Sequence, residues 1–149
     1  MRVVIQRVSE ASVTVDNAIV GSINRGYMLL IGIDENDESQ DADWLVQKIL
    51  NLRVFGDEEG KLNRSVMDIQ GEILCVSQFT LIADYKKGNR PSFIKAAKPD
   101  KAIPLFEYFK TEISKSGLKV ESGIFGADMK VALINDGPVT ILMDSHTKA

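Results

Sequence analysis

The chain is poor in the side chains that most often carry catalytic or metal chemistry: its 149 residues include one histidine and one cysteine. His146 stands in a polar tail, residues 144–149, which we expect to be frayed, so it is a weak prospect for a catalytic base or a metal ligand. One histidine and one cysteine cannot build an ordinary zinc site, and a Ser-His-Asp triad would need His146 in the core. We therefore expect no metal and no cofactor.

Long hydrophobic runs are also missing. No apolar stretch approaches the length that spans a bilayer, and residues 1–8 read as a strand rather than as a signal peptide. The single cysteine, Cys75, can form no internal disulfide, which suits a reducing compartment. These absences predict a cytoplasmic protein without membrane contact.

Basic charge is not in excess, because the net charge is −3, and this argues against a protein that coats long nucleic acids. One segment, residues 86–101, departs from that balance: its only acid is Asp100. The segment is either a solvated loop or a small phosphate-binding patch. Its basic residues are Lys86, Lys87, Arg90, Lys95, Lys98 and Lys101.

Familiar nucleotide and hydrolase motifs are absent as well. There is no Walker loop, no dinucleotide-binding glycine pattern and no Gly-x-Ser-x-Gly elbow. The acidic run 34–38 lacks the spacing and the glycine of a calcium-binding EF-hand loop, so we interpret it as surface charge near a helix start. The chain is therefore a non-enzyme, or an enzyme whose chemistry does not depend on a titrating side chain.

The length fits one domain, residues 1–149, and two segments predict helices. The first covers residues 42–50, with Asp37 and Ser39 as candidate caps. The second covers about 100–115, where Pro104 either kinks the helix or falls in its first turn. The apolar faces are Ala42, Leu45, Val46, Ile49 and Leu50 in the first helix, and Ala102, Leu105, Phe106, Phe109 and Ile113 in the second.

Short strands account for most of the remaining chain. Asp16-Asn17 predicts a hairpin turn, and the apolar run 27–33 is typical of a central strand covered on both faces. Because short turns join most neighbours, we predict an α+β fold of mostly antiparallel sheets that curl toward a barrel, with two main helices packed outside. The expected strands are 2–8, the hairpin 12–23, 27–33, 52–55, 72–82, 118–121, 129–134 and 139–143.

Two polar stretches interrupt this pattern. Ser77, Gln78 and Thr80 follow an apolar strand, and they either face solvent or line a pocket. In a pocket, the backbone N–H groups of this segment could hold the oxyanion that forms when water attacks an ester. The second stretch, Asn135–Thr140, contains Gly137-Pro138, which is either a plain hairpin turn with a trans bond or a cis bond whose carbonyls form a rigid acceptor pair.

Together, Ser-Gln-Phe-Thr-Leu at 77–81 and Asn-Asp-Gly-Pro-Val-Thr at 135–140 resemble the signature motifs of the D-aminoacyl-tRNA deacylases, also called D-tyrosyl-tRNA deacylases. The resemblance extends over the whole chain and includes residues 1–8, 89–93 and 125–129. Both motifs occur in order and at the family's spacing, which makes the resemblance specific.

This resemblance implies hydrolysis of the ester between a D-amino acid and the 3′-terminal adenosine of tRNA, with Gly-tRNA as a further substrate. It implies a homodimer in which a cis Gly137-Pro138 of one subunit enters the partner's site and rejects L-amino acids by a clash. Arg7 matches a residue that holds this motif in place. Segment 86–101 is then the candidate contact for acceptor-stem phosphates.

The family's site also maps onto the first motif. Ser77, Gln78, Phe79 and Thr80 would line the adenosine and ester end, with Ala102, Phe125 and Met129 on the walls. A nucleophilic Thr80 would need a base, and the sequence offers none nearby. Backbone N–H groups that hold the oxyanion, assisted by the tRNA 2′-hydroxyl, are the better interpretation.

Three alternatives remain open. The chain could hydrolyse small acyl esters without RNA, or bind RNA or peptide without catalysis. A related enzyme that removes L-alanine from mischarged tRNA is a third, although the Gly137-Pro138 pair argues against it.

Overall fold

Two long strands, β1 (Arg2–Val15) and β8 (Lys130–Asp144), organise the sheet in this computed structural model, which describes residues 1–148. They pair antiparallel over most of their length. On its other edge, β1 pairs antiparallel with β3 (Gly26–Gly32) through its first half and with β2 (Ala18–Ile23) through its second half. One long strand thus connects three neighbours.

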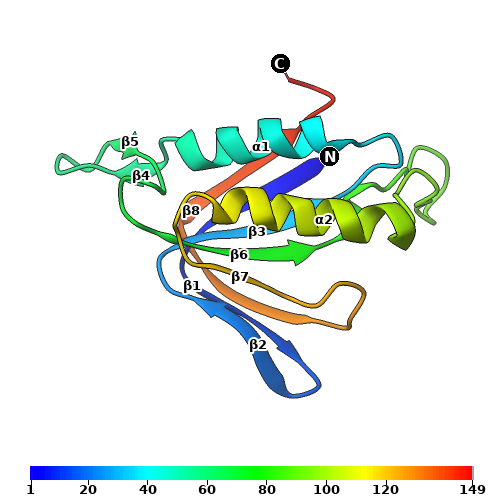
Figure 1. Cartoon of the computed structure of the whole chain (residues 1–149), viewed down its shortest axis with the longest axis horizontal. Helices are drawn as coiled ribbons and strands as arrows, with labels where there is room; N and C mark the ends of the chain where they lie inside the picture. The colour runs from blue at the N-terminus through cyan, green and yellow to red at the C-terminus, as the bar shows by residue number, and fades with distance from the viewer. Residues whose placement is uncertain (149) are drawn as a thin grey trace.

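The other half of the sheet is parallel. Strand β6 (Glu72–Ser77) pairs parallel with β3, and β7 (Val120–Ser122) pairs parallel with β6. Parallel neighbours need crossover connections, and helices α1 (Ser39–Asn51) and α2 (Pro99–Ser114) lie in these crossovers. Figure 1 shows the two helices side by side across one face of the sheet, with the small ribbon of β4 (Phe55–Gly56) and β5 (Leu62–Arg64) beyond the end of α1.

The sheet curls, and two separate cores lie against it. One core lies between the sheet and the helices, and a second lies inside the curl, where Val8, Val13 and Leu74 meet. Strand β2 closes the curl against β7, so closely that a Cβ on Gly21 would lie 2.8 Å from the Ser122 carbonyl oxygen. Three of the five pairings in this sheet are antiparallel, which confirms the predicted α+β fold.

Both helices bury the faces that their spacing predicted, and α2 covers nearly the predicted range. The cap of α1 differs from the prediction. The N-cap of α1 is Glu38, in a reciprocal capping box with Asp41, whereas Asp37 and Ser39 were expected as caps. Helix α2 begins at Pro99, so of the two alternatives for Pro104 the structure has the interior one, on the exposed side of the helix. No helix in residues 1–148 is long and apolar enough to cross a bilayer.

Two strand predictions were wrong in ways that matter for the site. The strand expected over 72–82 ends at Ser77, and Phe79–Leu81 forms a 3₁₀ turn, η1. The segment 129–143 is not a hairpin, because both of its halves pair with β1 as the single strand β8. The register of that pairing shifts around Val8, and the shift accommodates Gly137-Pro138, whose peptide bond is cis.

Candidate active site

A pocket of about 230 Å³ opens at the carboxyl ends of β3 and β6. It gathers residues from the end of β6, from α2 and from the connection between β7 and β8. Seven of the side chains predicted from the sequence line it: Ser77, Gln78, Phe79, Thr80, Ala102, Phe125 and Met129. The sequence did not single out the other lining residues, Ile31, Ile33, Ala97, Gly126 and Ala127. Ile31 and Ile33 belong to the predicted run 27–33, but nothing marked its end as a pocket wall.

The backbone leaves β6 in a way that frees two N–H groups. The Gln78 N–H still donates to the Ile31 carbonyl, and the N–H groups of Leu81 and Ile82 close the 3₁₀ turn on Gln78 and Phe79. Between them, the N–H groups of Phe79 and Thr80 have no acceptor within residues 1–148, as is usual in the first turn of a helical segment. Two unpaired donors therefore lie side by side in a segment that lines the pocket.

A side chain from the other end of the sequence supports this turn. Arg2 donates from Nη1 to the Leu81 carbonyl at 2.8 Å and from Nε to Asp144 Oδ2 at 3.0 Å. The turn is thus tied to both β1 and β8, which is the rigidity that a site built from backbone donors needs.

None of the twelve residues that line the pocket in the described structure has an acidic, basic or thiol side chain. Gln78 donates from Nε2 to Thr80 Oγ1 at 3.1 Å, so the nearest partner of the threonine hydroxyl is an amide and not a base. Cys75 is fully buried, and burial raises the pKa of its thiol to about 12, although Lys110 opposes the shift. The pocket therefore offers hydrogen-bond donors and shape, but no activated side-chain nucleophile.

The other predicted site residues lie elsewhere. Arg7 donates from Nε to the Asp136 carbonyl at 2.8 Å and from Nη1 to the Val54 carbonyl at 2.7 Å, and so holds the segment that carries Gly137-Pro138. Gly137 has a φ of +135°, and a Cβ there would lie 2.8 Å from Arg7 Nη2. Both Gly137 and Pro138 are exposed.

This motif does not reach the pocket of its own chain. Arg7 lies opposite Tyr27, near the start of β3, whereas Ile31 and Ile33 line the pocket at the end of β3. Four residues separate Tyr27 from Ile31, which is about 13 Å along a strand. The structure thus brings seven of the ten predicted residues together, and places Arg7, Gly137 and Pro138 at a distance.

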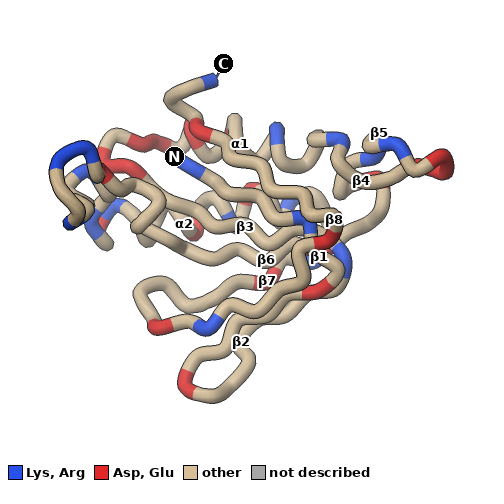
Figure 2. The backbone as a smooth tube through the Cα atoms, turned by 180° about the vertical axis from the view of Figure 1, so that it is seen from behind, with Lys and Arg blue, Asp and Glu red and all other residues tan. Residues whose placement is uncertain are grey.

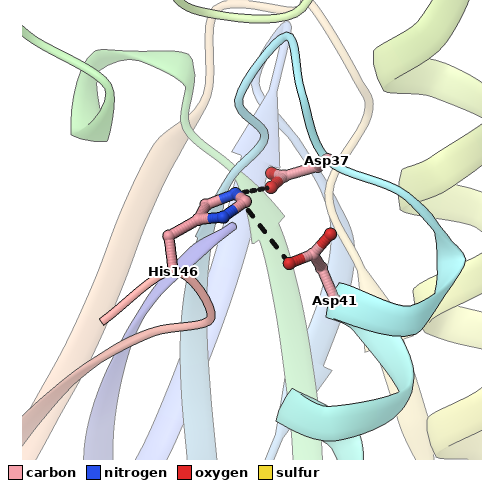
Figure 3. Close-up of side chains that lie close together, drawn as sticks. All are labelled: Asp37, Asp41 and His146. Carbon is pink, nitrogen blue, oxygen red and sulfur yellow. Dashed lines mark hydrogen bonds and ion pairs between the residues drawn. The ribbon is translucent and has the colours of Figure 1, made fainter. Parts of the chain in front are cut away.

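The only histidine is not part of this pocket, and its tail is not frayed through residue 148. His146 Nε2 lies 2.6 Å from Asp37 Oδ1 and 3.8 Å from Asp41 Oδ1, as Figure 3 shows. These three side chains could each offer a ligand atom to a metal. However, the Met1 α-ammonium already lies 2.6 Å from Asp37 Oδ1 and 2.8 Å from the buried Ser145 hydroxyl. We therefore interpret the cluster as structural, with the Met1–Asp37 ion pair at its centre. The last residue of the tail, Ala149, lies outside the described residues.

The basic segment 86–101 runs from the loop after η1 into the first turn of α2, and all six of its basic residues are exposed. None of them forms an ion pair with a carboxylate in residues 1–148. Figure 2 shows Lys and Arg gathered on this loop at one end of the molecule. Because Ala97 and Ala102 line the pocket, the positive surface begins at the pocket's rim.

Comparison with known proteins shows which family the chain resembles. A family model described as "D-Tyr-tRNA(Tyr) deacylase" matches residues 4–144. The chain is 58% identical over 149 residues to a protein of Flavobacterium psychrophilum and 55% identical to one of Bacteroides thetaiotaomicron. Both are named D-aminoacyl-tRNA deacylase, and each match covers 99% of both chains.

Solved structures give the same fold. The structure titled "c-Myc DNA Unwinding Element Binding Protein" superposes with a TM-score of 0.91 at 46% identity, covering 97% of this chain and 98% of that one. A second, described as a probable eukaryotic D-amino acid tRNA deacylase, gives a TM-score of 0.83 at 20% identity, covering 95% and 97%, and supports the fold alone. With full-length relatives above 50% identity and a family model that spans nearly the whole sequence, the chain belongs to the D-aminoacyl-tRNA deacylase family.

Proposed function

We propose that this protein hydrolyses the ester bond of D-aminoacyl-tRNA and releases the D-amino acid and free tRNA. The observation that carries the proposal is the pocket itself: two unpaired backbone donors, at Phe79 and Thr80, in a pocket without an ionisable side chain. An activated ester needs little more than oxyanion stabilisation and a positioned water, because its leaving group is already good. Full-length relatives named D-aminoacyl-tRNA deacylase support the substrate.

The proposed reaction follows from these groups. A water oxygen attacks the ester carbonyl carbon, and the carbonyl oxygen gains negative charge that the Phe79 and Thr80 N–H groups stabilise. The 2′-hydroxyl of the terminal ribose accepts a proton from the water through hydrogen bonding and passes one to the departing 3′-oxygen. The carbon–oxygen ester bond then breaks, leaving a free amino acid and a 3′-hydroxyl. Thr80 contributes its backbone rather than its hydroxyl.

We propose that selection against L-amino acids depends on a second copy of the chain. Gly137-Pro138 is exposed and fixed by Arg7, yet it does not line the pocket of its own chain. Arg7 pairs with Tyr27, which lies about 13 Å along β3 from Ile31 in the pocket wall. A two-fold dimer could place this motif of each subunit over the pocket of the other, where its backbone would meet an L side chain. Glycine has no side chain to clash, so Gly-tRNA is expected to be hydrolysed as well.

The basic segment 86–101 is the proposed contact for the tRNA acceptor stem, because its six cations are exposed and unneutralised by carboxylates in residues 1–148. We place this activity in the cytoplasm, where aminoacyl-tRNAs are used.

The function is tested by following D-Tyr-tRNA, L-Tyr-tRNA and Gly-tRNA side by side at low enzyme concentration. The proposal predicts rapid loss of the D-Tyr and Gly esters, with the L-Tyr ester spared. Equal loss of the D-Tyr and L-Tyr esters would leave an esterase without chiral selection. Binding of tRNA by a folded protein with no turnover of any ester would overturn the catalytic assignment in favour of a binding module.

A further inference from the structure

A second hollow lies next to the first one along the same chain segments. Its volume is about 270 Å³, and its polar lining consists of Arg2, Asp34, Asp84, Tyr85, Lys86 and Lys95. Thr80 lines the first pocket and Ile82 the second, while on the opposite wall Ala97 lines the first and Lys95 the second. Only one residue separates the two linings on each wall, so the hollows are neighbours.

The chemistry of this second hollow differs from that of the first. It combines cations with an aromatic ring: Lys86 and Lys95 form no ion pair with a carboxylate in residues 1–148, and the Tyr85 side chain is 75% exposed. An exposed aromatic ring beside unneutralised lysines is the combination that binds single-stranded nucleic acid, because the ring stacks on a base while the cations meet the phosphate.

Two carboxylates in the hollow add a possible readout of the base. Asp34 and Asp84 each use Oδ1 to accept a backbone N–H of their own loop, from Asn36 and Lys86 respectively. Their Oδ2 atoms accept no hydrogen bond from residues 1–148. A carboxylate oxygen is the usual acceptor for the exocyclic amino group of cytosine.

We propose that this hollow is a subsite for the penultimate nucleotide of the tRNA, the cytidine that precedes the terminal adenosine in every C-C-A end. The inference rests on the proposed function, with the terminal adenosine and its ester taken to lie in the first pocket. The cytosine ring stacks on Tyr85, its amino group donates to Asp34 or Asp84, and the phosphate between the two nucleosides meets Lys86 and Lys95.

The subsite is tested with short esters of one amino acid: 3′-O-D-tyrosyl adenosine, the same ester on the dinucleotide CpA, and the same ester on UpA. For the unmodified protein, kcat/KM for the CpA ester is expected to exceed that for the adenosine ester about tenfold or more, the range that stacking of one base supports. UpA is expected to fall between them, because uracil presents an acceptor where cytosine presents its amino group.

The variant Tyr85→Ala is expected to lower the ratio of the CpA to the adenosine rate toward one. Lys61→Ala, an equally simple change in the exposed β4–β5 ribbon at the far end of the molecule, should leave the ratio as in the unmodified protein (Figure 1). Equal rates on the CpA and adenosine esters, or a ratio that Tyr85→Ala leaves intact, would overturn the subsite while leaving the proposed function in place. If the protein hydrolysed neither these esters nor D-Tyr-tRNA, both the subsite and the proposed function would be overturned.

Discussion

At the scale of single residues, the pocket separates the roles of backbone and side chain. Thr80 lines it, but its hydroxyl accepts a hydrogen bond from Gln78 and has no carboxylate or imidazole beside it. The backbone N–H of the same residue is unpaired within residues 1–148. Substitutions that remove only the side chain therefore distinguish the two roles.

Replacing Thr80 by valine keeps the shape of the side chain and removes the hydroxyl. We expect kcat for D-Tyr-tRNA deacylation to fall less than about fivefold, because the backbone donors remain and no base is available to activate the hydroxyl. Single-turnover deacylation measures this directly. A loss of about a thousandfold would instead show that the hydroxyl takes part in the chemistry.

A side chain on Gly137 would be crowded by its neighbours and strained by the backbone conformation. In Gly137→Ala, the added Cβ meets Arg7 Nη2 at 2.8 Å, at a φ of +135°, and Arg7 or the loop must move. We expect kcat/KM for D-Tyr-tRNA to fall about 100-fold while the far-ultraviolet circular dichroism spectrum stays unchanged.

The matched control for this change is Gly60→Ala. Gly60 also has a positive φ, +79°, but no atom lies within 4 Å of an added Cβ. Gly60→Ala therefore also places an alanine at a positive φ, but it does so on the β4–β5 ribbon, away from the motif. If both variants lost activity equally, the loss at Gly137 would be one of general stability, and the assigned role would be wrong.

At the scale of elements, the two ends of the chain hold the site's framework together. The start of β1, the loop before α1 and the segment after β8 meet at Asp37, which is fully buried. This carboxylate accepts from the Met1 α-ammonium at 2.6 Å and from the Asp34 N–H at 2.7 Å.

Removing the charge of Asp37 leaves the buried Met1 ammonium group without its carboxylate partner. We expect Asp37→Asn to lower the free energy of unfolding by about 3 kcal/mol, in the range for breaking one side of a buried pair. Urea unfolding followed by tryptophan fluorescence measures it. Asp128→Asn, which breaks an exposed pair with Lys130, should cost less than about 0.5 kcal/mol. Similar losses in the two variants would contradict the account.

The same region predicts how stability depends on pH. Partial burial disfavours the charged form of Asp144, but hydrogen bonds from the His146 backbone and the Arg2 side chain outweigh it, so its pKa is below the usual range. The pKa of Asp41 is also lowered: burial again opposes the shift, and the Ser145 side chain and Glu38 backbone outweigh it. Such a carboxylate stabilises the fold fully at pH values above its pKa in the unfolded chain, about 3.9. This contribution is lost as the pH falls through the lowered pKa of the folded state.

Asp144→Asn tests that dependence. The variant should be less stable than the unmodified protein at pH 7, by about 1 kcal/mol. It should also lose less stability between pH 5 and pH 3, because one carboxylate with a lowered pKa is gone. Urea midpoints measured across this range give both quantities, and parallel pH profiles for the two proteins would contradict the assignment to Asp144.

Periodicity predicted the elements better than it predicted their ends. The buried faces of both helices and the central strand β3 followed from the spacing of apolar residues. The sequence did not reveal that β8 continues through Gly137-Pro138, because a Gly-Pro pair looks like a turn unless the pairing of both flanks with β1 is known. The docking of His146 was also missed, since its partner Asp37 is 109 residues away in the chain.

At the scale of the whole molecule, one chain holds two parts of the proposed site without bringing them together. Motif resemblance predicted both parts, and the structure gathers Ser77–Thr80, Ala102, Phe125 and Met129 around one pocket. Gly137-Pro138 is not part of that lining, and Arg7 holds it beside the opposite end of β3. A composite site of two subunits is the arrangement that uses both parts, and it requires that each subunit complete the other.

The most direct test is complementation between two inactive variants. Ala127→Trp is designed to fill the pocket, which Ala127 lines, and Gly137→Ala is designed to displace the motif. In dimers that contain one subunit of each variant, one of the two composite sites has an intact pocket and an intact motif. Co-expressed as an equal mixture, the inactive variants should recover about a quarter of the unmodified D-Tyr-tRNA deacylation rate, because half the dimers are mixed and each holds one good site. Activity no higher than that of either variant alone, with mixed dimers shown to be present, would contradict a site shared between subunits.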